Sequence, residues 1–287
     1  FLKMSGDIAG HFVDAFTGNI IFIYQVDRNK MYNVRIWQPQ PDGRPTRTIS
    51  AQEGEWDDID MMVRAFQGAM MALKTSPVPV VVAPAGLTLG GGCEMGLHAD
   101  RVQAAAETYM GLVEVGVGLL PAGGGTKELL IRMGNPQTAF ETIGFGKVAT
   151  SGHDAKKIGY LRDVDGVTMN RDELLADAKA VALERVRAGY QPPQFREDIK
   201  VGGQDVYATL SLGVHLAWRA GRISDHDALI GRKIARVLAG GDLPAAGIVT
   251  EQRLLDIERE GFLSLCGEPK TLERIAHTLK TGKTLRN

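Results

Sequence analysis

Two runs of three glycines, at residues 90–92 and 123–125, each stand directly before a segment with the pattern of a helix. Consecutive glycines are costly to order, because glycine loses more backbone freedom on folding than any other residue. The first N–H groups of a helix lack internal partners and carry partial positive charge. The first run therefore predicts a turn whose bare main chain, for example the N–H of Gly91, can meet an oxygen that develops negative charge.

Nucleotide phosphates do not fit either glycine run. The phosphate loop GxxxxGK[ST] is absent, since Lys127 follows Thr126 rather than a glycine. The dinucleotide pattern GxGxxG is also absent, because Gly116 and Gly118 are followed by Leu119, Leu120 and Pro121, so that proline stands in place of the third glycine. The sequence thus favours an anionic ligand or intermediate of another kind.

Hydrophobic periodicity and turn residues predict a mixed α/β chain. Expected strands lie at 19–24, 32–37, 78–83, 101–105 and 109–112, with a turn-rich break at 39–45. Expected helices begin near Trp56 and Cys93, run over 126–133 up to the stop at Gly134-Asn135-Pro136, and follow the caps Ser151 and Asn170. Beyond Pro193, residues 204–287 have the pattern of several amphipathic helices, which suggests a packing or assembly element.

Two carboxylates stand in apolar surroundings next to these turns. Glu94 lies just past the first turn of the predicted helix, and Glu114 follows 20 residues later. Two carboxyl groups that share an apolar cleft can acquire different pKa values, which leaves one as an acid and the other as a base. With a backbone donor beside them, they suit proton transfer next to a carbonyl group.

Composition excludes several classes of function. The formal net charge is -1, from 33 basic and 34 acidic residues, so no footprint for nucleic acid or an anionic membrane is expected. The two cysteines, Cys93 and Cys266, predict neither a disulfide framework nor a zinc site, and a cytoplasmic location fits. No membrane span and no signal peptide are expected. The chain begins with Phe1 and is expected to be a fragment of something longer.

Four linked motifs carry a resemblance to a known family: residues 79–86 (PVVVAPAG), 89–94 (LGGGCE), 111–114 (GLVE) and 120–126 (LPAGGGT). In this order they resemble the crotonase (enoyl-CoA hydratase/isomerase) superfamily over roughly residues 51–190. The ending at 280–287, KTGKTLRN, resembles that of bacterial multidomain 3-hydroxyacyl-CoA dehydrogenases.

The resemblance implies an α/β fold of ββα turns wound as a superhelix, with a C-terminal helical region used in assembly. It divides the chain into a divergent or truncated segment at 1–50, a crotonase-like core at 51–195 and a helical assembly region at 196–287. Homo-oligomers, often trimers, are implied. An NAD-binding half is not recognisable, so NAD is expected only if a dehydrogenase domain lies upstream of this chain.

The implied activity is hydration of a trans-2-enoyl-CoA in fatty-acid β-oxidation, with coenzyme A as part of the substrate and no bound cofactor. By position, Glu114 matches the group that protonates the α carbon, and Glu94 matches the group that activates water. Gly91 matches an oxyanion donor and Gly90 adjoins it, whereas Gly123 and Gly124 are expected to play supporting parts. A metal is not expected, because His98 and Glu94 do not form an HExxH pattern.

The chain departs from the family at its second oxyanion donor. The family places this donor in an alanine- or serine-glycine-alanine-aspartate-like loop upstream of the helix near Asp57, where residues 47–52 (RTISAQ) stand instead. Two alternatives therefore remain open beside hydration. One is enoyl-CoA isomerisation on the same fold, and the other is a catalytically impaired module that binds acyl-CoA or serves in assembly. Cys93 is expected to be a buried residue rather than a nucleophile, since no His–Asp arrangement accompanies it.

Overall fold

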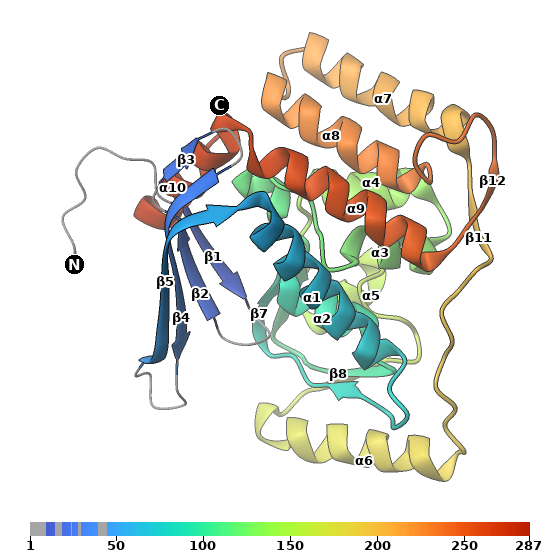
Figure 1. Cartoon of the computed structure of the whole chain (residues 1–287). Helices are drawn as coiled ribbons and strands as arrows, with labels where there is room; N and C mark the ends of the chain where they lie inside the picture. Colours follow the sequence, from blue (N-terminus) through green and yellow to red (C-terminus); the bar gives the residue numbers. More distant parts are fainter. Residues whose placement is uncertain (1–9, 15–18, 24, 28–29, 40–44) are drawn as a thin grey trace.

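The computed structural model has an antiparallel sheet near the N-terminus, a helix-covered centre and a C-terminal group of helices (Figure 1). It describes residues 10–14, 19–23, 25–27, 30–39 and 45–287, with side chains from Asp58 onward. Within this part the sheet consists of β1 (Gly10–Asp14), β2 (Asn19–Ile23), β3 (Gln25–Asp27), β4 (Lys30–Pro39) and β5 (Pro45–Glu55). The strand order is β1-β2-β4-β3, and β5 pairs with β4.

The N-terminal sheet confirms two expected strands. The turn expected at 39–45 lies mostly outside the described residues. β2 and β4 lie where strands were predicted at 19–24 and 32–37, whereas residues 40–44 of the predicted turn are outside the described part. β5 runs without a break into helix α1 (Trp56–Lys74). Residues 47–52 therefore lie within a strand, at the place where the resemblance implies an oxyanion loop.

The centre of the chain shows the ββα repeat directly in its strand register. β6 (Val81–Val82) pairs in parallel with β8 (Arg101–Ala105), and β7 (Gly86–Leu89) pairs in parallel with β9 (Thr108–Gly111). Val81 lies opposite Arg101 and Gly86 opposite Thr108. β6 and β7 thus each have a parallel partner, β8 and β9, in the next repeat. The helix α2 (Gly91–His98) connects the two repeats, as parallel pairing requires a crossover.

Three expectations about elements need correction. The strand predicted at 78–83 is reduced to Val81 and Val82, because Pro79 has no N–H to donate to a sheet. Asn135 not only follows α3 (Gly125–Met133) but also begins α4 (Pro136–Gly144), since its side chain accepts the N–H groups of Gln137 and Thr138. Asn170 caps the short 3₁₀ helix η2 (Arg171–Glu173), and the long helix α6 (Leu174–Arg187) begins after it.

The remaining elements complete the centre and form the C-terminal helical group. Ser151 caps α5 (Gly152–Ile158) as predicted, and β10 (Gly166–Thr168) adds a third parallel strand beside β8. The tail contains α7 (Gly203–Arg219), α8 (Asp225–Leu238), α9 (Glu251–Cys266) and α10 (Pro269–Thr281), with the strand pair β11 (Ile199–Val201) and β12 (Gly247–Val249). The predicted amphipathic helices of 204–287 are therefore present. Among the described residues, no helix combines the length and hydropathy needed to cross a bilayer.

One apolar core joins the centre to the tail. Buried side chains from α1, α2, α3, α8 and α9 belong to a single cluster, for example Val63, Leu97, Leu129, Ile234 and Leu254. In Figure 1, α9 lies across the molecule between α1 and the α7–α8 pair. The C-terminal helices therefore share the hydrophobic core of the centre in addition to any part they play in assembly.

Candidate active site

Glu94 lies in the first turn of α2, and the second glycine run holds its carboxylate. Its Oε1 accepts hydrogen bonds from the N–H of Gly123 at 2.8 Å and from the N–H of Gly125 at 2.9 Å. The residue is 2% exposed. Because Gly124 and Gly125 begin α3, the carboxylate lies at the positive end of a helix dipole. The structure thus brings together the carboxylate that follows the first glycine run and the main chain of the second.

The second glycine run has no room for side chains. A Cβ on Gly123 would lie 2.2 Å from the Phe66 ring and 2.6 Å from Glu94 Oε2. A Cβ on Gly124, whose φ is +103°, would lie 2.8 Å from His98 Nε2. Gly123 therefore acts on Glu94 directly through its N–H, whereas Gly124 turns the chain against the His98 ring. Phe66 of α1 and Glu94 Oε2 thus both lie against Gly123.

Glu114 faces the first glycine run from across the site. It begins the short 3₁₀ helix η1 (Glu114–Val117), which follows β9 after Leu112 and Val113. Its Oε1 lies 3.4 Å from the position that a Cβ would take on Gly90. Its Oε2 is buried without a hydrogen-bond partner in the described part of the chain. A buried carboxyl oxygen without a partner is rare in folded proteins and is a common feature of catalytic groups.

Burial raises the pKa of both glutamates. The pKa of Glu94 rises to about 7 because burial disfavours the charged form, although the N–H bonds from Gly125 and Gly123 and the charge of Lys127 oppose this. The pKa of Glu114 rises to about 8 because of burial and the nearby charge of Glu94. The two groups interact, so these pKa values describe the pair as a unit. Near neutral pH the pair can hold a proton on Glu114 while Glu94 is partly ionised.

The first glycine run presents a main-chain donor beside Glu114. Gly90, with φ +54° and ψ −126°, precedes α2 and ties the two loops together, since its N–H donates to Gly111 O at 2.9 Å. Gly91 is the first helical residue and is half-buried. None of the described residues accepts a hydrogen bond from the Gly91 N–H. This geometry can stabilise negative charge on an oxygen that lies close to Glu114.

Comparison with known proteins identifies the family to which this site belongs. Residues 49–189 match the family described as enoyl-CoA hydratase/isomerase. A probable 3-hydroxyacyl-CoA dehydrogenase of Bacillus subtilis (strain 168) is 47% identical over 247 residues, which are 83% of this chain and 31% of that protein. The chain belongs to the crotonase superfamily.

Other crotonase relatives are more distant. A putative fatty acid oxidation complex trifunctional enzyme of Rickettsia felis is 26% identical over 80% of this chain and 30% of its own length. The mitochondrial methylglutaconyl-CoA hydratase of Mus musculus is 31% identical over 61% of this chain and 55% of its own length. An enoyl-CoA hydratase structure from Bacillus halodurans gives a TM-score of 0.49 at 19% identity, covering 76% of this chain and 68% of that one. The chain spans about a third of the length of the first two relatives.

A third buried carboxyl group, that of Glu258, lies near Glu94 in this crotonase chain and was not predicted from the sequence. It lies in α9, is fully buried, and its Oε1 accepts the N–H of Thr126 at 2.8 Å. Its Oε2 has no hydrogen-bond partner in the described part of the chain. Burial and the charge of Glu94 raise the pKa of Glu258 well above its usual value. We refer to Glu94, Glu114 and Glu258 as the acid cluster, since none of them forms an ion pair with a described residue.

A second buried group of charges includes two residues of α3, Lys127 and Glu128. Lys127 Nζ donates to Glu128 Oε1 at 2.7 Å and to Glu251 Oε1 at 2.8 Å, and Lys74 binds the same two oxygens. These four residues, the ion-pair cluster, join α1, α3 and α9. The charges of the lysines lower the pKa of Glu128 and of Glu251 although burial opposes this. Two positive and two negative side chains thus balance one another within the core.

His98 and Cys93 are both buried, which confirms the expected burial of Cys93. His98 Nδ1 lies 2.8 Å from Glu94 O and its Nε2 lies 3.1 Å from Lys127 Nζ. Burial and the charge of Lys127 lower the pKa of His98 to about 3, so the ring is neutral, with its proton on Nδ1. Burial raises the pKa of the Cys93 thiol well above its usual value, which makes it a poor nucleophile. No cluster with the composition of a metal site occurs among the described residues.

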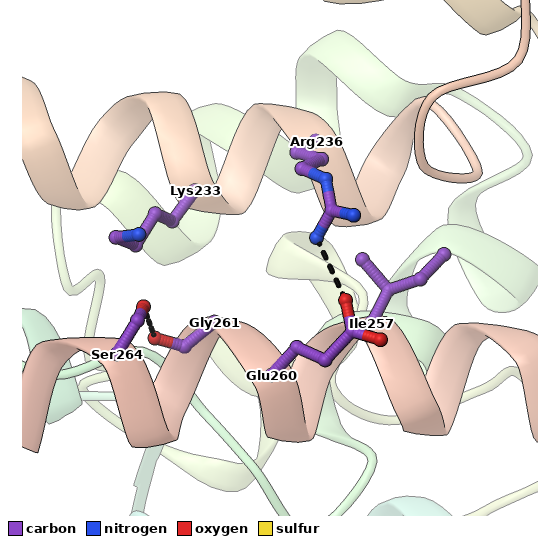
Figure 2. Close-up of a pocket in the computed structure, with 6 residues that line it drawn as sticks. All are labelled: Lys233, Arg236, Ile257, Glu260, Gly261 and Ser264. Atoms are coloured by element: carbon purple, nitrogen blue, oxygen red, sulfur yellow. Dashed lines mark hydrogen bonds and ion pairs between the residues drawn. The ribbon is translucent and has the colours of Figure 1, made fainter.

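Two hollows lie away from the glutamate pair. Figure 2 shows one between α8 and α9, where Arg236 pairs with Glu260 and the Ser264 hydroxyl donates to Gly261 O. Its cavity volume of about 160 Å³ is small for a thioester of coenzyme A, since ligand pockets typically measure about 300–1,000 Å³. The other hollow, of about 410 Å³, lies between α1 and α9. Neither is lined by Glu94 or Glu114.

Proposed function

We propose that this chain adds water across the 2,3 double bond of a trans-2-enoyl-CoA. The observation that carries the proposal is the pair of buried, interacting carboxyl groups, Glu94 and Glu114, beside the N–H of Gly91, which donates to none of the described residues. The thioester oxygen would accept the hydrogen bond from Gly91, which stabilises the enolate charge. Half-buried backbone at 90–92 and 113–117 provides the side from which the substrate would approach.

The pKa order supports a division of roles. Glu94, with the lower pKa, would take a proton from water while the water oxygen forms a bond to the β carbon. The π electrons of the double bond move toward the thioester, and Glu114 gives its proton to the α carbon. One water is thereby added, and a proton passed from Glu94 back to Glu114 restores the starting state. General acid and base catalysis of this kind contributes about 10²–10⁴-fold for each group.

The names of the relatives support hydration further. The proposed product is a 3-hydroxyacyl thioester, which is the substrate class named for the Bacillus subtilis relative. A hydratase unit within a longer dehydrogenase protein would supply that substrate. Such an arrangement, a role in β-oxidation, a cytoplasmic location and assembly as a homo-oligomer remain predictions.

One observation favours a second candidate, isomerisation of the double bond. Glu94 Oε1 already accepts two N–H bonds, and Phe66 lies beside Oε2, so water has limited access to this carboxylate. Glu114 alone could then move a proton between the α and γ carbons of a 3-enoyl-CoA. With β5 in place of the family's loop, one oxyanion donor fewer would lower either rate by roughly 10²–10³-fold.

Incubation of the purified chain with crotonyl-CoA tests the proposal. We expect loss of the conjugated thioester absorbance and formation of 3-hydroxybutyryl-CoA. Glu94→Gln and Glu114→Gln should each lower turnover by about 10²–10⁴-fold, and the exposed-site variant Glu184→Gln should not. Turnover only of 3-enoyl-CoA would select isomerisation instead. Binding of the thioester without either reaction would contradict both and select the non-catalytic module.

A further inference from the structure

The turn that carries Glu114 has few hydrogen bonds of its own. η1 contains only four residues, and the bonds that close it run from Gly116 N–H to Val113 O at 2.9 Å, from Gly118 N–H to Val115 O at 3.2 Å and from Leu119 N–H to Glu114 O at 3.0 Å. Residues 113–117 are half-buried. A single 3₁₀ turn holds its residues weakly, because few bonds close it and their geometry is poor. The position of Glu114 therefore depends on what packs against the turn.

Arg274 of α10 binds the main chain of this turn. It is 1% exposed, and its Nη1 donates to Val115 O at 3.2 Å. The same guanidinium pairs with Asp227 at 2.8 Å and donates to Ser224 Oγ at 3.2 Å. Ser224 and Asp227 form the capping box of α8. Arg274 thus connects the start of α8 to the turn through a fixed planar group.

Thr271, one helical turn earlier in α10, binds the residue that ends the same turn. Its hydroxyl donates to Gly118 O at 2.8 Å, and His226 Nε2 lies 2.9 Å from the hydroxyl oxygen. Since the hydroxyl hydrogen is used toward Gly118, His226 must donate from Nε2. All three residues are buried. The hydroxyl is therefore held from both sides in one orientation.

The glycines of the turn permit this close approach. Gly118 has a φ of +88°, and a Cβ there would lie 2.9 Å from both Thr271 Cα and Thr271 Oγ1. A Cβ on Gly116 would lie 2.9 Å from the methyl group of Thr284, beyond the end of α10. Main chain from two parts of the sequence more than 150 residues apart (Gly118 and Thr271) is thus in direct contact.

We propose that α10 positions Glu114 for catalysis through two contacts, Arg274 with Val115 O and Thr271 with Gly118 O. The inference rests on the proposed role of Glu114 as the group that protonates the α carbon. It gives the C-terminal helices a part in the active site of their own chain, in addition to any part in assembly. Arg274, Thr271 and His226 are positioning residues, since they act on the main chain of the turn and not on the substrate.

Two variants of Thr271 test the proposal. Thr271→Val has a similar shape but loses both hydrogen bonds, whereas Thr271→Ser keeps them. We expect Thr271→Val to lower kcat on crotonyl-CoA by about ten- to a hundredfold with little change in KM, because the acid is displaced by a fraction of an ångström or more. The alkaline limb of its pH profile should also move. Thr271→Ser should restore most of kcat and the profile of the unchanged chain.

Unchanged kcat and pH profile in a folded Thr271→Val variant would overturn the proposal, as would equal loss in the Val and Ser variants. If Thr271→Val does not fold, His226→Leu, which removes the donor to Thr271, carries the same test. If the unchanged chain turns over no enoyl-CoA, the proposed function fails separately. The positioning effect is then judged by infrared titration of the Glu114 carboxyl. A shift of its titration in Thr271→Val supports the proposal, and no shift contradicts it.

Discussion

The acid cluster and the ion-pair cluster both contact α3 and are both largely buried, but their carboxyl groups are in opposite protonation states. Glu114 and Glu258 have raised pKa values, because burial and the charge of Glu94 act on them without a paired cation. Glu128 and Glu251 have lowered pKa values, because Lys127 and Lys74 contact them directly. Burial alone therefore does not decide protonation here. The presence of a bonded cation does.

The two clusters also make opposite contributions to stability as pH changes. Ionised Glu128 and Glu251 stabilise the fold above their unfolded pKa of 4.5, and this contribution is lost as pH falls through their lowered folded values. The acid cluster binds protons more tightly when folded. Its contribution is present below pH 4.5 and is lost as pH rises through about 7 and 8 for Glu94 and Glu114. At neutral pH the ion-pair cluster stabilises the fold, whereas the acid cluster has lost part of the stabilising contribution that it makes at low pH.

Removing one of the two cations from the ion-pair cluster should have the largest effect. Lys127→Met leaves Glu128 and Glu251 with one lysine between them, so we expect the free energy of unfolding to fall by about 3–5 kcal/mol. Urea denaturation measures this change. The double variant Lys127→Met/Glu128→Gln removes one charge of each sign and should be less destabilised than the single variant. A double variant that is as unstable as the sum of both single variants would contradict the charge argument.

Adding one methyl group at Gly123, beside the acid cluster, should have the next largest effect. Gly123→Ala places its Cβ against Phe66 and Glu94 Oε2, so Glu94 must move from its two N–H bonds. We expect kcat to fall by about a hundredfold and stability to fall by about 1–3 kcal/mol. Gly213→Ala is a suitable control, because Gly213 lies in α7 with nothing within 4 Å of its Cβ position. Equal behaviour of the two variants in the hydration assay would contradict the placement of Glu94.

Replacing Glu258 should have the smallest effect on activity, and its effect on stability should appear as a change in pH dependence. The folded chain keeps a proton on Glu258 that the unfolded chain loses above pH 4.5, so stability falls as pH rises. Glu258→Gln removes this dependence. Between pH 5 and 8 the slope of unfolding free energy against pH should become less negative by at most about 1.4 kcal/mol per pH unit, the value for one proton. An unchanged slope in urea denaturations across this range would show that Glu258 is ionised in the folded chain.

The sequence predicted the parts of this molecule whose signals are local. Strand 101–105 and the helix after Gly124 lie where apolar runs and glycines indicated, and Glu94 and Glu114 were identified through linked motifs. α4 was missed although Asn135 and Pro136 form a common helix start, because the same residues also mark the end of α3. Strand 78–83 was overestimated where Pro79 interrupts hydrogen bonding.

Long-range contacts could not be predicted from the sequence. Glu258 meets Thr126 across 132 positions and Glu251 meets Lys127 across 124, so no spacing connects them. Their signal, carboxylates within the apolar pattern of α9, is equally typical of a solvent-facing helix side. The part that Gly123 plays in holding Glu94 was likewise visible only once both turns were placed together.

Infrared titration of protonated carboxyl groups tests the contrast between the two clusters most directly. We expect the folded chain at pH 7 to show a protonated carboxyl band that weakens as pH rises through about 8, and Glu114→Gln should remove part of it. Glu128→Gln should leave the band unchanged, since that group is ionised beside Lys127. Absence of the band at pH 7, or a band insensitive to Glu114→Gln, would contradict the account.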